Sequence, residues 1–159
     1  MMAGKFTFKV NGIERTVEAE VDTLLIDVLR EKLNLTGTKR GCDNSTCGSC
    51  VVILNGKAVK SCQKKIAQVD GGEVITVEGL SRGKELHPVQ KALVKAGAIQ
   101  CGFCTPGIAT ELAALFEENP DADEETIMRA LNKHLCRCTG YEDIKNGALL
   151  AQKLMKDER

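Results

Sequence analysis

The chain has 159 residues, of which 43% are hydrophobic and 28% charged, which is enough for one sizeable core or two small ones. Its 22 lysines and arginines balance 22 aspartates and glutamates, so no positive excess draws it to nucleic acid or anionic lipid. The opening MMAGKFTFKV lacks a continuous apolar signal segment, and no later run approaches the roughly 20 apolar residues that span a bilayer. We therefore expect a cytoplasmic protein without nucleic-acid binding or membrane insertion.

The first half of the chain has the pattern of β-structure. Alternating residues surround the pair Asn11-Gly12, and a second such segment surrounds Asn55-Gly56. Asn-Gly supplies the positive φ angles that a two-residue hairpin turn requires. We predict hairpins over residues 5–20 and 51–62, and a further strand over residues 73–79.

A short amphipathic helix is expected between the two hairpins, over residues 24–35. Its apolar residues recur at helical spacing, with charged residues on the opposite face. Asp22 or Thr23 is the expected N-cap, because short oxygen-bearing side chains accept the first free N–H groups of a helix. This half is therefore predicted to be a small mixed sheet crossed by a helix.

The second half of the chain has the pattern of helices. A connector rich in Gly and Ser covers residues 79–86, and no β-rich segment follows it. Pro88 and Pro106 suit the first turns of helices, Asn119-Pro120 marks a helix end, and Asp123 suits an N-cap. The predicted helices cover residues 88–97, 106–119, 124–135 and 147–156, and four helices of this kind would form a bundle.

Eight cysteines fall into two groups of four, with none between Cys62 and Cys101. A reducing compartment discourages structural disulfides, and a chain of this size does not need them to fold. The pattern therefore indicates two metal sites of four thiolates each. The first group is Cys42, Cys47, Cys50 and Cys62, and the second is Cys101, Cys104, Cys136 and Cys138.

The first group has the spacing C-x4-C-x2-C followed by one distant cysteine, which is the plant-type pattern for a [2Fe-2S] cluster. The loop GCDNSTCGSC is rich in small residues, as a backbone that wraps a cluster must be. A structural zinc site is the alternative, because four thiolates also suit tetrahedral zinc. Zinc sites usually pair two short knuckles, however, so the spacing favours iron and sulfur.

The second group pairs C-x2-C with C-x-C, and its spacing is less decisive. Ligands one residue apart are awkward around a single tetrahedral ion but suit one iron of a two-iron cluster. This favours [2Fe-2S] over zinc. A thioredoxin-like redox role for Cys101 and Cys104 is a minor alternative, because no βαβ context surrounds them.

Four motifs in order, GCDNSTCGSC, KSC, QCGFCTPG and LCRCTGY, closely resemble the iron-sulfur subunit of the molybdenum hydroxylases, the xanthine dehydrogenase and carbon monoxide dehydrogenase group. The resemblance covers roughly residues 6–154. It implies an α+β fold with an N-terminal β-grasp, plant-type ferredoxin domain (residues 1–79), a linker (80–86) and a C-terminal four-helix domain (87–159), each domain carrying one [2Fe-2S] cluster. Many relatives carry Gly where this chain has Ser45.

The resemblance also implies a function and partners. The chain would relay electrons between a molybdopterin-binding large subunit and an FAD-binding medium subunit, in a dimer of heterotrimers, and would hold no substrate site of its own. Gln100 would hydrogen-bond the pterin, and Cys138 would lie beside the pterin amine. The substrate, which could be a purine, an aldehyde, an aromatic thioester, a heterocycle or carbon monoxide, is not encoded here.

Two rival functions remain open from the residues: a free-standing ferredoxin-type carrier and a zinc-stapled interaction module. His87 and His134 could suggest Rieske-type ligation, but eight cysteines already fill two clusters, so both are expected to be capping or surface residues. Arg137 is either a balance for cluster charge or an ordinary surface residue. The acidic run over residues 117–125 is expected to be a solvated loop and helix start.

Overall fold

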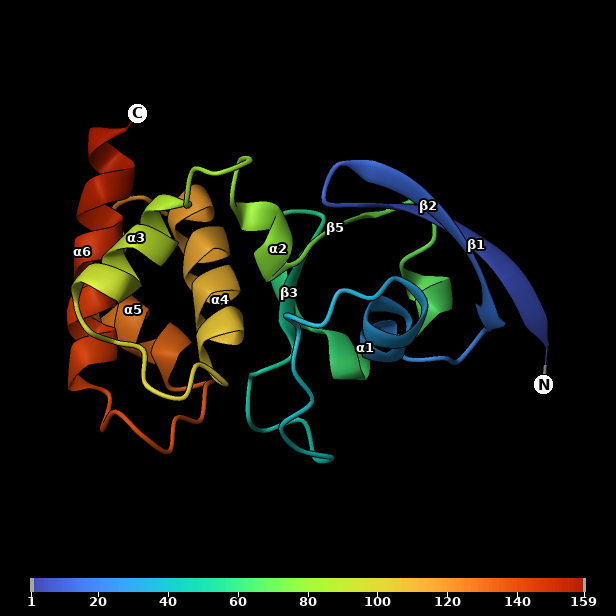
Figure 1. Cartoon of the computed structure of the whole chain (residues 1–159), viewed down its shortest axis with the longest axis horizontal. Coiled ribbons are helices and arrows are strands. Elements are labelled where there is room, and N and C mark those ends of the chain that lie inside the picture. Colours follow the sequence, from blue (N-terminus) through green and yellow to red (C-terminus); the bar gives the residue numbers. More distant parts are fainter. Residues whose placement is uncertain (1, 159) are drawn as a thin grey trace.

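The computed structural model describes residues 2–158. A five-stranded sheet formed by the first half lies beside a group of helices formed by the second half, and the two chain ends lie at opposite sides of the molecule (Figure 1). The buried apolar residues form two clusters, one within the sheet half and one among the helices, and the second also includes Ile53 of the sheet. The architecture is therefore mixed α+β, as the sequence predicted.

The sheet has the strand order β2-β1-β5-β3-β4 and is mixed, since β1 pairs with β5 in parallel while the other pairs are antiparallel. Both predicted hairpins are confirmed: Asn11 (φ 52°) with Gly12 (φ 78°), and Asn55 (φ 50°) with Gly56 (φ 81°), take the left-handed backbone that a tight hairpin turn requires. The strands are β1 (Ala3–Val10), β2 (Ile13–Glu20), β3 (Val51–Leu54), β4 (Lys57–Lys60) and β5 (Glu73–Ile75).

The helix predicted over residues 24–35 begins and ends at other residues in the structure. Neither Asp22 nor Thr23 caps it, because Leu24 is still extended and pairs with Lys65 in a β-bridge. The Thr23 carbonyl is also taken, by the Ile66 N–H at 2.8 Å. The helix α1 (Leu25–Asp27) therefore starts at Leu25 and widens into a π-helical turn over Val28–Lys32. Two short 3-10 turns cover Ser61–Gln63 and Ile66–Gln68.

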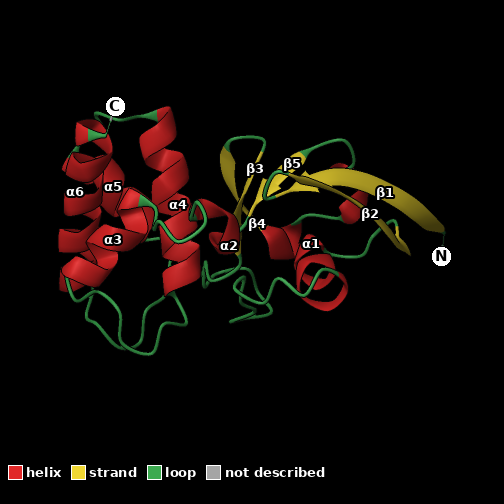
Figure 2. Cartoon of the chain, turned by 45° about the horizontal axis from the view of Figure 1, so that its top comes forward, coloured by secondary structure: helices red, strands yellow, loops and turns green. Residues whose placement is uncertain are grey.

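The predicted strand over residues 73–79 is shorter than expected. The side chain of Asn11 accepts a hydrogen bond from the Thr76 N–H at 2.9 Å, which removes that donor from the sheet. The chain then turns into the short helix α2 (Val77–Leu80). Figure 2 shows α2 between the sheet and the helices.

Four longer helices form the second half, with α3 packed along α6 and α4 next to the sheet (Figure 1). Pro88 opens α3, Pro106 lies in the first turn of α4, and Asp123 caps α5 by accepting the Thr126 N–H at 2.8 Å, all as predicted. Asn119 closes α4. The bounds are α3 (Pro88–Lys95), α4 (Thr105–Glu118), α5 (Glu124–Leu131) and α6 (Glu142–Asp157).

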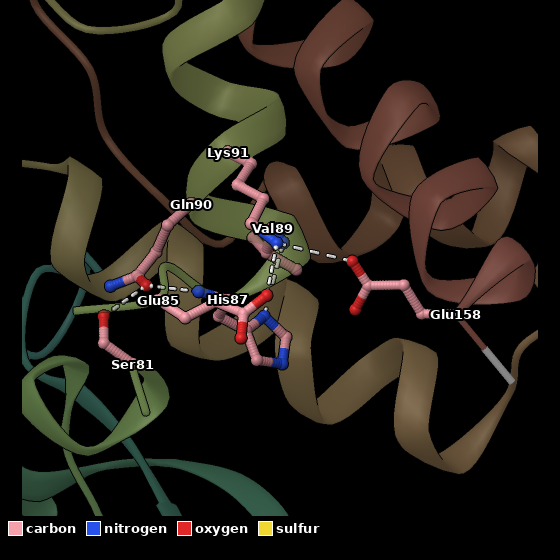
Figure 3. Close-up of polar contacts among 7 residues, drawn as sticks. All are labelled: Ser81, Glu85, His87, Val89, Gln90, Lys91 and Glu158. Carbon is pink, nitrogen blue, oxygen red and sulfur yellow. Dashed lines mark hydrogen bonds and ion pairs between the residues drawn. The ribbon is translucent and has the colours of Figure 1, made fainter. Parts of the chain in front are cut away.

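Side chains fix the start of α3 at the connector (Figure 3). His87 caps the helix, since its Nδ1 accepts the Val89 N–H at 3.3 Å, and the Gln90 side chain accepts the His87 N–H at 2.9 Å. Lys91 reaches both Glu85 and Glu158, so the connector and the end of α6 are tied to the same helix turn. The capping role expected for His87 is confirmed.

The helix α4 joins the two halves. Its Thr110 hydroxyl donates to the Val51 carbonyl of β3 at 2.8 Å. A Cβ atom on Gly107 would lie 2.3 Å from the Gly48 carbonyl oxygen, so only glycine permits this approach. The loop that carries the first cysteines is therefore pressed against the start of α4.

Among residues 2–158, no helix combines the length and the apolar character needed to cross a membrane.

Candidate metal centres

The first four cysteines come together at one end of the sheet. Cys42, Cys47 and Cys50 lie in the loop before β3, and Cys62 follows β4, the antiparallel neighbour of β3. The Sγ atoms of Cys50 and Cys62 are 3.3 Å apart, and the Cys47 N–H donates to Cys42 Sγ at 3.4 Å. The β3–β4 hairpin thus brings Cys62, which is distant in the sequence, back to the loop that carries the other three cysteines.

These thiols have very different proton affinities. Backbone hydrogen bonding, above all from the Cys47 N–H, lowers the pKa of Cys42 to about 6, despite some opposing desolvation. Burial raises the pKa of Cys50 to about 11. Only a thiolate ligates a metal, so Cys42 is ready at neutral pH while Cys50 must release a proton when a metal binds.

Ser45 lies next to Cys62, and Lys60 bonds Ser45; the sequence did not predict either contact. The Ser45 hydroxyl lies 3.4 Å from Cys62 Sγ, and Lys60 Nζ donates to the Ser45 carbonyl at 2.6 Å. Ser45 has φ 61°, in the left-handed region that favours glycine. This backbone conformation explains why glycine suits the position.

The second four cysteines lie in the two loops at one end of the helices. Cys101 and Cys104 precede α4, while Cys136 and Cys138 lie between α5 and α6. Cys104 and Cys136 are buried, whereas Cys101 and Cys138 are exposed. A cavity of about 230 Å³ is lined by Cys101, Cys104 and Cys136.

Burial and neighbouring thiols together set the pKa values in this group. Burial, followed by a hydrogen bond with Cys136, raises the pKa of Cys104 to about 12. A hydrogen bond with Cys101 is the main influence that raises the pKa of Cys138. The buried thiols therefore form one pair and the exposed thiols form another.

Tyr141 holds the loop between α5 and α6, a role that the sequence analysis missed. Its hydroxyl accepts the Cys136 N–H at 2.8 Å and donates to the His134 carbonyl at 3.1 Å. Tyr141 itself has φ 73°, unusual for a residue other than glycine, and this turn starts α6. The signal was the tyrosine that ends LCRCTGY, which was used only as part of a motif.

The two sites meet directly. The Cys47 carbonyl accepts the Leu135 N–H at 2.9 Å, so a ligand candidate of the first site is bonded to the neighbour of Cys136 in the second. Gly41 and Cys47 also line the cavity of the second site. A Cβ atom on Gly41 would lie 3.0 Å from both Cys47 Sγ and the Phe103 ring.

Large apolar side chains are exposed around the second site. Phe103 is 44% exposed and Leu135 62%, and both line its cavity. Gln100, next to the exposed Cys101, is also exposed, and so is Arg137. We name this surface the apolar rim and define it by Phe103 and Leu135, together with Ile99 (39% exposed), which precedes Phe103 by four residues in the sequence.

The arrangement of the thiols fits a two-iron cluster. All eight cysteines are free thiols. Thiol pairs beside a cavity suit two bridged irons better than one tetrahedral zinc.

The prediction that both histidines are capping or surface residues is wrong for His134. It lies just past α5, but it is only 3% exposed because its ring packs against Gly48 of the first site. Its ring nitrogens make no hydrogen bond with the described residues. Sequence pattern alone could not show this, since the contact joins the two halves of the chain.

Comparison with known proteins agrees with this geometry. Residues 8–80 match the model of the 2Fe-2S iron-sulfur cluster binding domain, and residues 76–149 match the model of the [2Fe-2S] binding domain. The chain is 44% identical to the nicotine 6-hydroxylase small subunit of Paenarthrobacter nicotinovorans, over 89% of this chain and 85% of that subunit.

Two further comparisons cover almost the whole of this chain. The structure superposes on quinoline 2-oxidoreductase from Pseudomonas putida 86 with a TM-score of 0.90 and 35% identity, over 99% of both chains. The aldehyde oxidoreductase of Megalodesulfovibrio gigas is 41% identical over 94% of this chain, but the chain spans only 17% of that protein.

Together the fold and the paired thiol sites define a two-cluster iron-sulfur protein. The chain belongs to the family of [2Fe-2S] small subunits of the molybdenum hydroxylases. It is a subunit of an oxidoreductase and carries two [2Fe-2S] binding domains, a composition that serves electron transfer.

Proposed function

We propose that this chain relays electrons between a molybdenum site and a flavin, both held by partner subunits. The observation that carries the proposal is the direct meeting of the two thiol sites, where the Leu135 N–H bonds the Cys47 carbonyl at 2.9 Å. A protein built only to hold metals for stability needs no such contact. A relay does need it, because electron transfer slows steeply with distance.

Each residue set has a defined task in this proposal. Cys42, Cys47, Cys50 and Cys62 hold the distal cluster in a β-grasp ferredoxin domain (residues 1–79), and Cys101, Cys104, Cys136 and Cys138 hold the proximal cluster in a four-helix domain (87–159), with residues 80–86 as linker. A [2Fe-2S] cluster accepts and gives up one electron at a time. The chain fixes the spacing of the sites, excludes water from the buried thiols and supplies hydrogen bonds to sulfur.

The apolar rim is the proposed docking surface for the molybdopterin-binding subunit. Phe103 and Leu135 are exposed beside the exposed thiols, and a bound partner would exclude water from this surface. Gln100 lies at this surface and is proposed to hydrogen-bond the pterin, with Cys138 beside the pterin amine. The distal site, on the sheet half, is proposed to face the FAD-binding subunit.

The sizes of the relatives support partner subunits. The chain spans 17% of the Megalodesulfovibrio gigas aldehyde oxidoreductase but 85% of the nicotine 6-hydroxylase small subunit. The same unit thus occurs within a longer chain and as a subunit. We extend the proposal to a dimer of heterotrimers in the cytoplasm, where thiols stay reduced until clusters are inserted.

Copurification tests the proposal. The tagged chain, expressed in its own host, should bring down two larger subunits together with molybdenum, iron and flavin. Recovery of the loaded chain alone, at several salt concentrations, would favour the free-standing ferredoxin-type carrier instead.

A substitution at Gln100 tests the pterin contact. Gln100→Leu should leave both clusters assembled, because no thiol is lost, yet slow the reduction of the clusters by substrate in the complex. Loss of one buried hydrogen bond costs about 1–3 kcal/mol. Gln63→Leu is the matched control, since Gln63 is exposed and follows Cys62 of the other site. Equal reduction rates in the two variants would exclude the contact.

A further inference from the structure

The helix α4 carries an acidic residue, Glu111, where an apolar one is expected. Glu111 is only 6% exposed and lies between buried residues, among them Thr110 and Leu112. Removing a carboxylate from water is unfavourable unless the charge is paired. An apolar side chain would fill the same space without that cost, so the carboxylate must serve a purpose other than packing.

Two consecutive residues beyond α5 lie against this carboxylate: Lys133 forms an ion pair with it, and the buried His134 ring lies beside it. Lys133 Nζ lies 2.7 Å from Glu111 Oε1, and His134 Nε2 lies 3.7 Å from Glu111 Oε2. The His134 side chain is completely buried, while that of Lys133 is 55% exposed. Burial by itself would raise the pKa of Glu111, but these contacts outweigh it and lower the pKa, so the group is a carboxylate at neutral pH.

The opposite side of the His134 ring contacts Gly48, in the loop that carries Cys42, Cys47 and Cys50. A Cβ atom on Gly48 would lie 2.5 Å from His134 Nδ1 and 2.5 Å from the Lys133 carbonyl oxygen. On its other side, a Cβ atom on Gly107 of α4 would lie 2.3 Å from the Gly48 carbonyl oxygen. Gly48, between Cys47 and Cys50, is therefore clamped between α4 and the segment that leads to Cys136.

We propose that Glu111 and His134 are positioning residues that set the spacing and orientation of the two clusters, and thereby the rate of electron transfer between them. Glu111 forms an ion pair with Lys133, the buried His134 ring is packed between Glu111 and Gly48, and the Leu135 N–H that follows bonds the Cys47 carbonyl. Outer residues of this kind orient ligands without touching the metal. The inference rests on the two-cluster function proposed above.

The test uses the complex purified with its partner subunits. In Glu111→Gln the charge is lost while the shape is kept, so Lys133 loses its ion pair and the buried His134 ring loses the carboxylate beside it. Glu118→Gln is the matched control, an exposed glutamate at the end of the same helix. Two readouts are independent of substrate turnover. The first is the splitting of the paramagnetic resonance signals that magnetic coupling between the two clusters causes in the fully reduced protein. The second is the rate at which the clusters exchange an electron after partial reduction.

We expect Glu111→Gln to retain the iron and sulfide of the wild type, but with a changed splitting and a slower exchange, whereas Glu118→Gln matches the wild type. Glu111→Met is the second variant, because an apolar side chain packs in α4 without an unpaired amide. It should show the same changes.

Wild-type splitting and exchange in both variants, or loss of clusters in both, would overturn the proposal. The second outcome would mean that Glu111 supports cluster assembly rather than spacing. A wild-type protein that itself shows no pair of coupled clusters would contradict the two-cluster function instead, so the two failures are distinguishable.

Discussion

The Leu135 N–H donates a hydrogen bond to the Cys47 carbonyl at 2.9 Å, although the two residues belong to different thiol sites. Cys47 is buried, and Leu135 directly precedes Cys136. The bond therefore provides a short route of backbone atoms between two cysteines that the proposed function assigns to different clusters. It depends on backbone atoms only, so most side-chain changes at residue 135 leave it intact.

Leu135→Pro tests this route, because proline has no N–H. The change leaves the buried Cys47 carbonyl without its donor, which should cost about 1–3 kcal/mol and slow electron exchange between the clusters. Leu135→Ala removes the same side chain and keeps the N–H. If the two variants exchange electrons equally fast, the hydrogen bond is not part of the route.

Gly107→Ala should destabilise the contact between the two halves. Alanine favours a helix over glycine by about 1 kcal/mol, but here its Cβ would lie 2.3 Å from the Gly48 carbonyl, and such overpacking costs about 1–3 kcal/mol. Gly147→Ala in α6 is the control, since its Cβ would lie 3.0 Å from Leu93 Cδ2, the end of a side chain rather than backbone. Chemical unfolding of the loaded protein measures both; a Gly107 variant at least as stable as the Gly147 variant would contradict the close contact.

Ser45 offers a test of hydrogen bonding to sulfur. Ser45→Ala and Ser45→Gly both remove the hydroxyl that lies 3.4 Å from Cys62 Sγ, so both should lower the reduction potential of the distal cluster. Only glycine relieves the left-handed backbone (φ 61°), which costs other residues about 1–2 kcal/mol. The glycine variant should therefore unfold at higher denaturant than the alanine variant. Unchanged potentials would show that the hydroxyl does not act on the cluster.

His87 should make stability depend on pH. Burial lowers its pKa below the ordinary value of 6.5, although Glu117 and Glu158 partly oppose this. As the pH falls, the unfolded chain is therefore protonated first. The contribution of His87 to stability is complete above pH 6.5 and is lost as the pH falls through the pKa of the folded state. Protonation also removes the Nδ1 lone pair that accepts the Val89 N–H.

His87→Asn separates this effect from other titrations, because asparagine caps helices without titrating. The difference in melting temperature between wild type and variant should change between about pH 7 and pH 5, where an ordinary histidine titrates. A difference that stays constant over this range would exclude His87 as its source.

Local signals in the sequence were reliable where local physics decides the structure. The Asn-Gly pairs at residues 11 and 55 require positive φ, and Pro88 and Pro106 suit first helical turns, so both hairpins and the starts of α3 and α4 were predicted correctly. The last helix was predicted from residue 147 but begins at Glu142, after the left-handed turn at Tyr141. The helix start at Leu25 was missed, because the chain just before it is held by residues 64–66, far along the sequence.

The same distinction applies to the sites. Cysteine spacing predicted two groups of four. The structure places Cys50 Sγ 3.3 Å from Cys62 Sγ in the first group, and Cys101, Cys104 and Cys136 around one cavity in the second. The burial of His134 and the pairing of Glu111 were not predictable, because both depend on how the loop at Gly48 meets the helices. No periodicity within either half contains that information.

The most direct test of the central claim is the number and type of metal centres per chain, measured anaerobically by iron, sulfide and zinc analysis together with the spin count of the reduced protein. Eight thiols in two sites predict about four irons, about four acid-labile sulfides and two unpaired spins per chain. Cys104→Ser should then remove or perturb the proximal signal and preserve the distal one. Half the iron with a single spin in the wild type, or zinc in place of iron, would contradict the account.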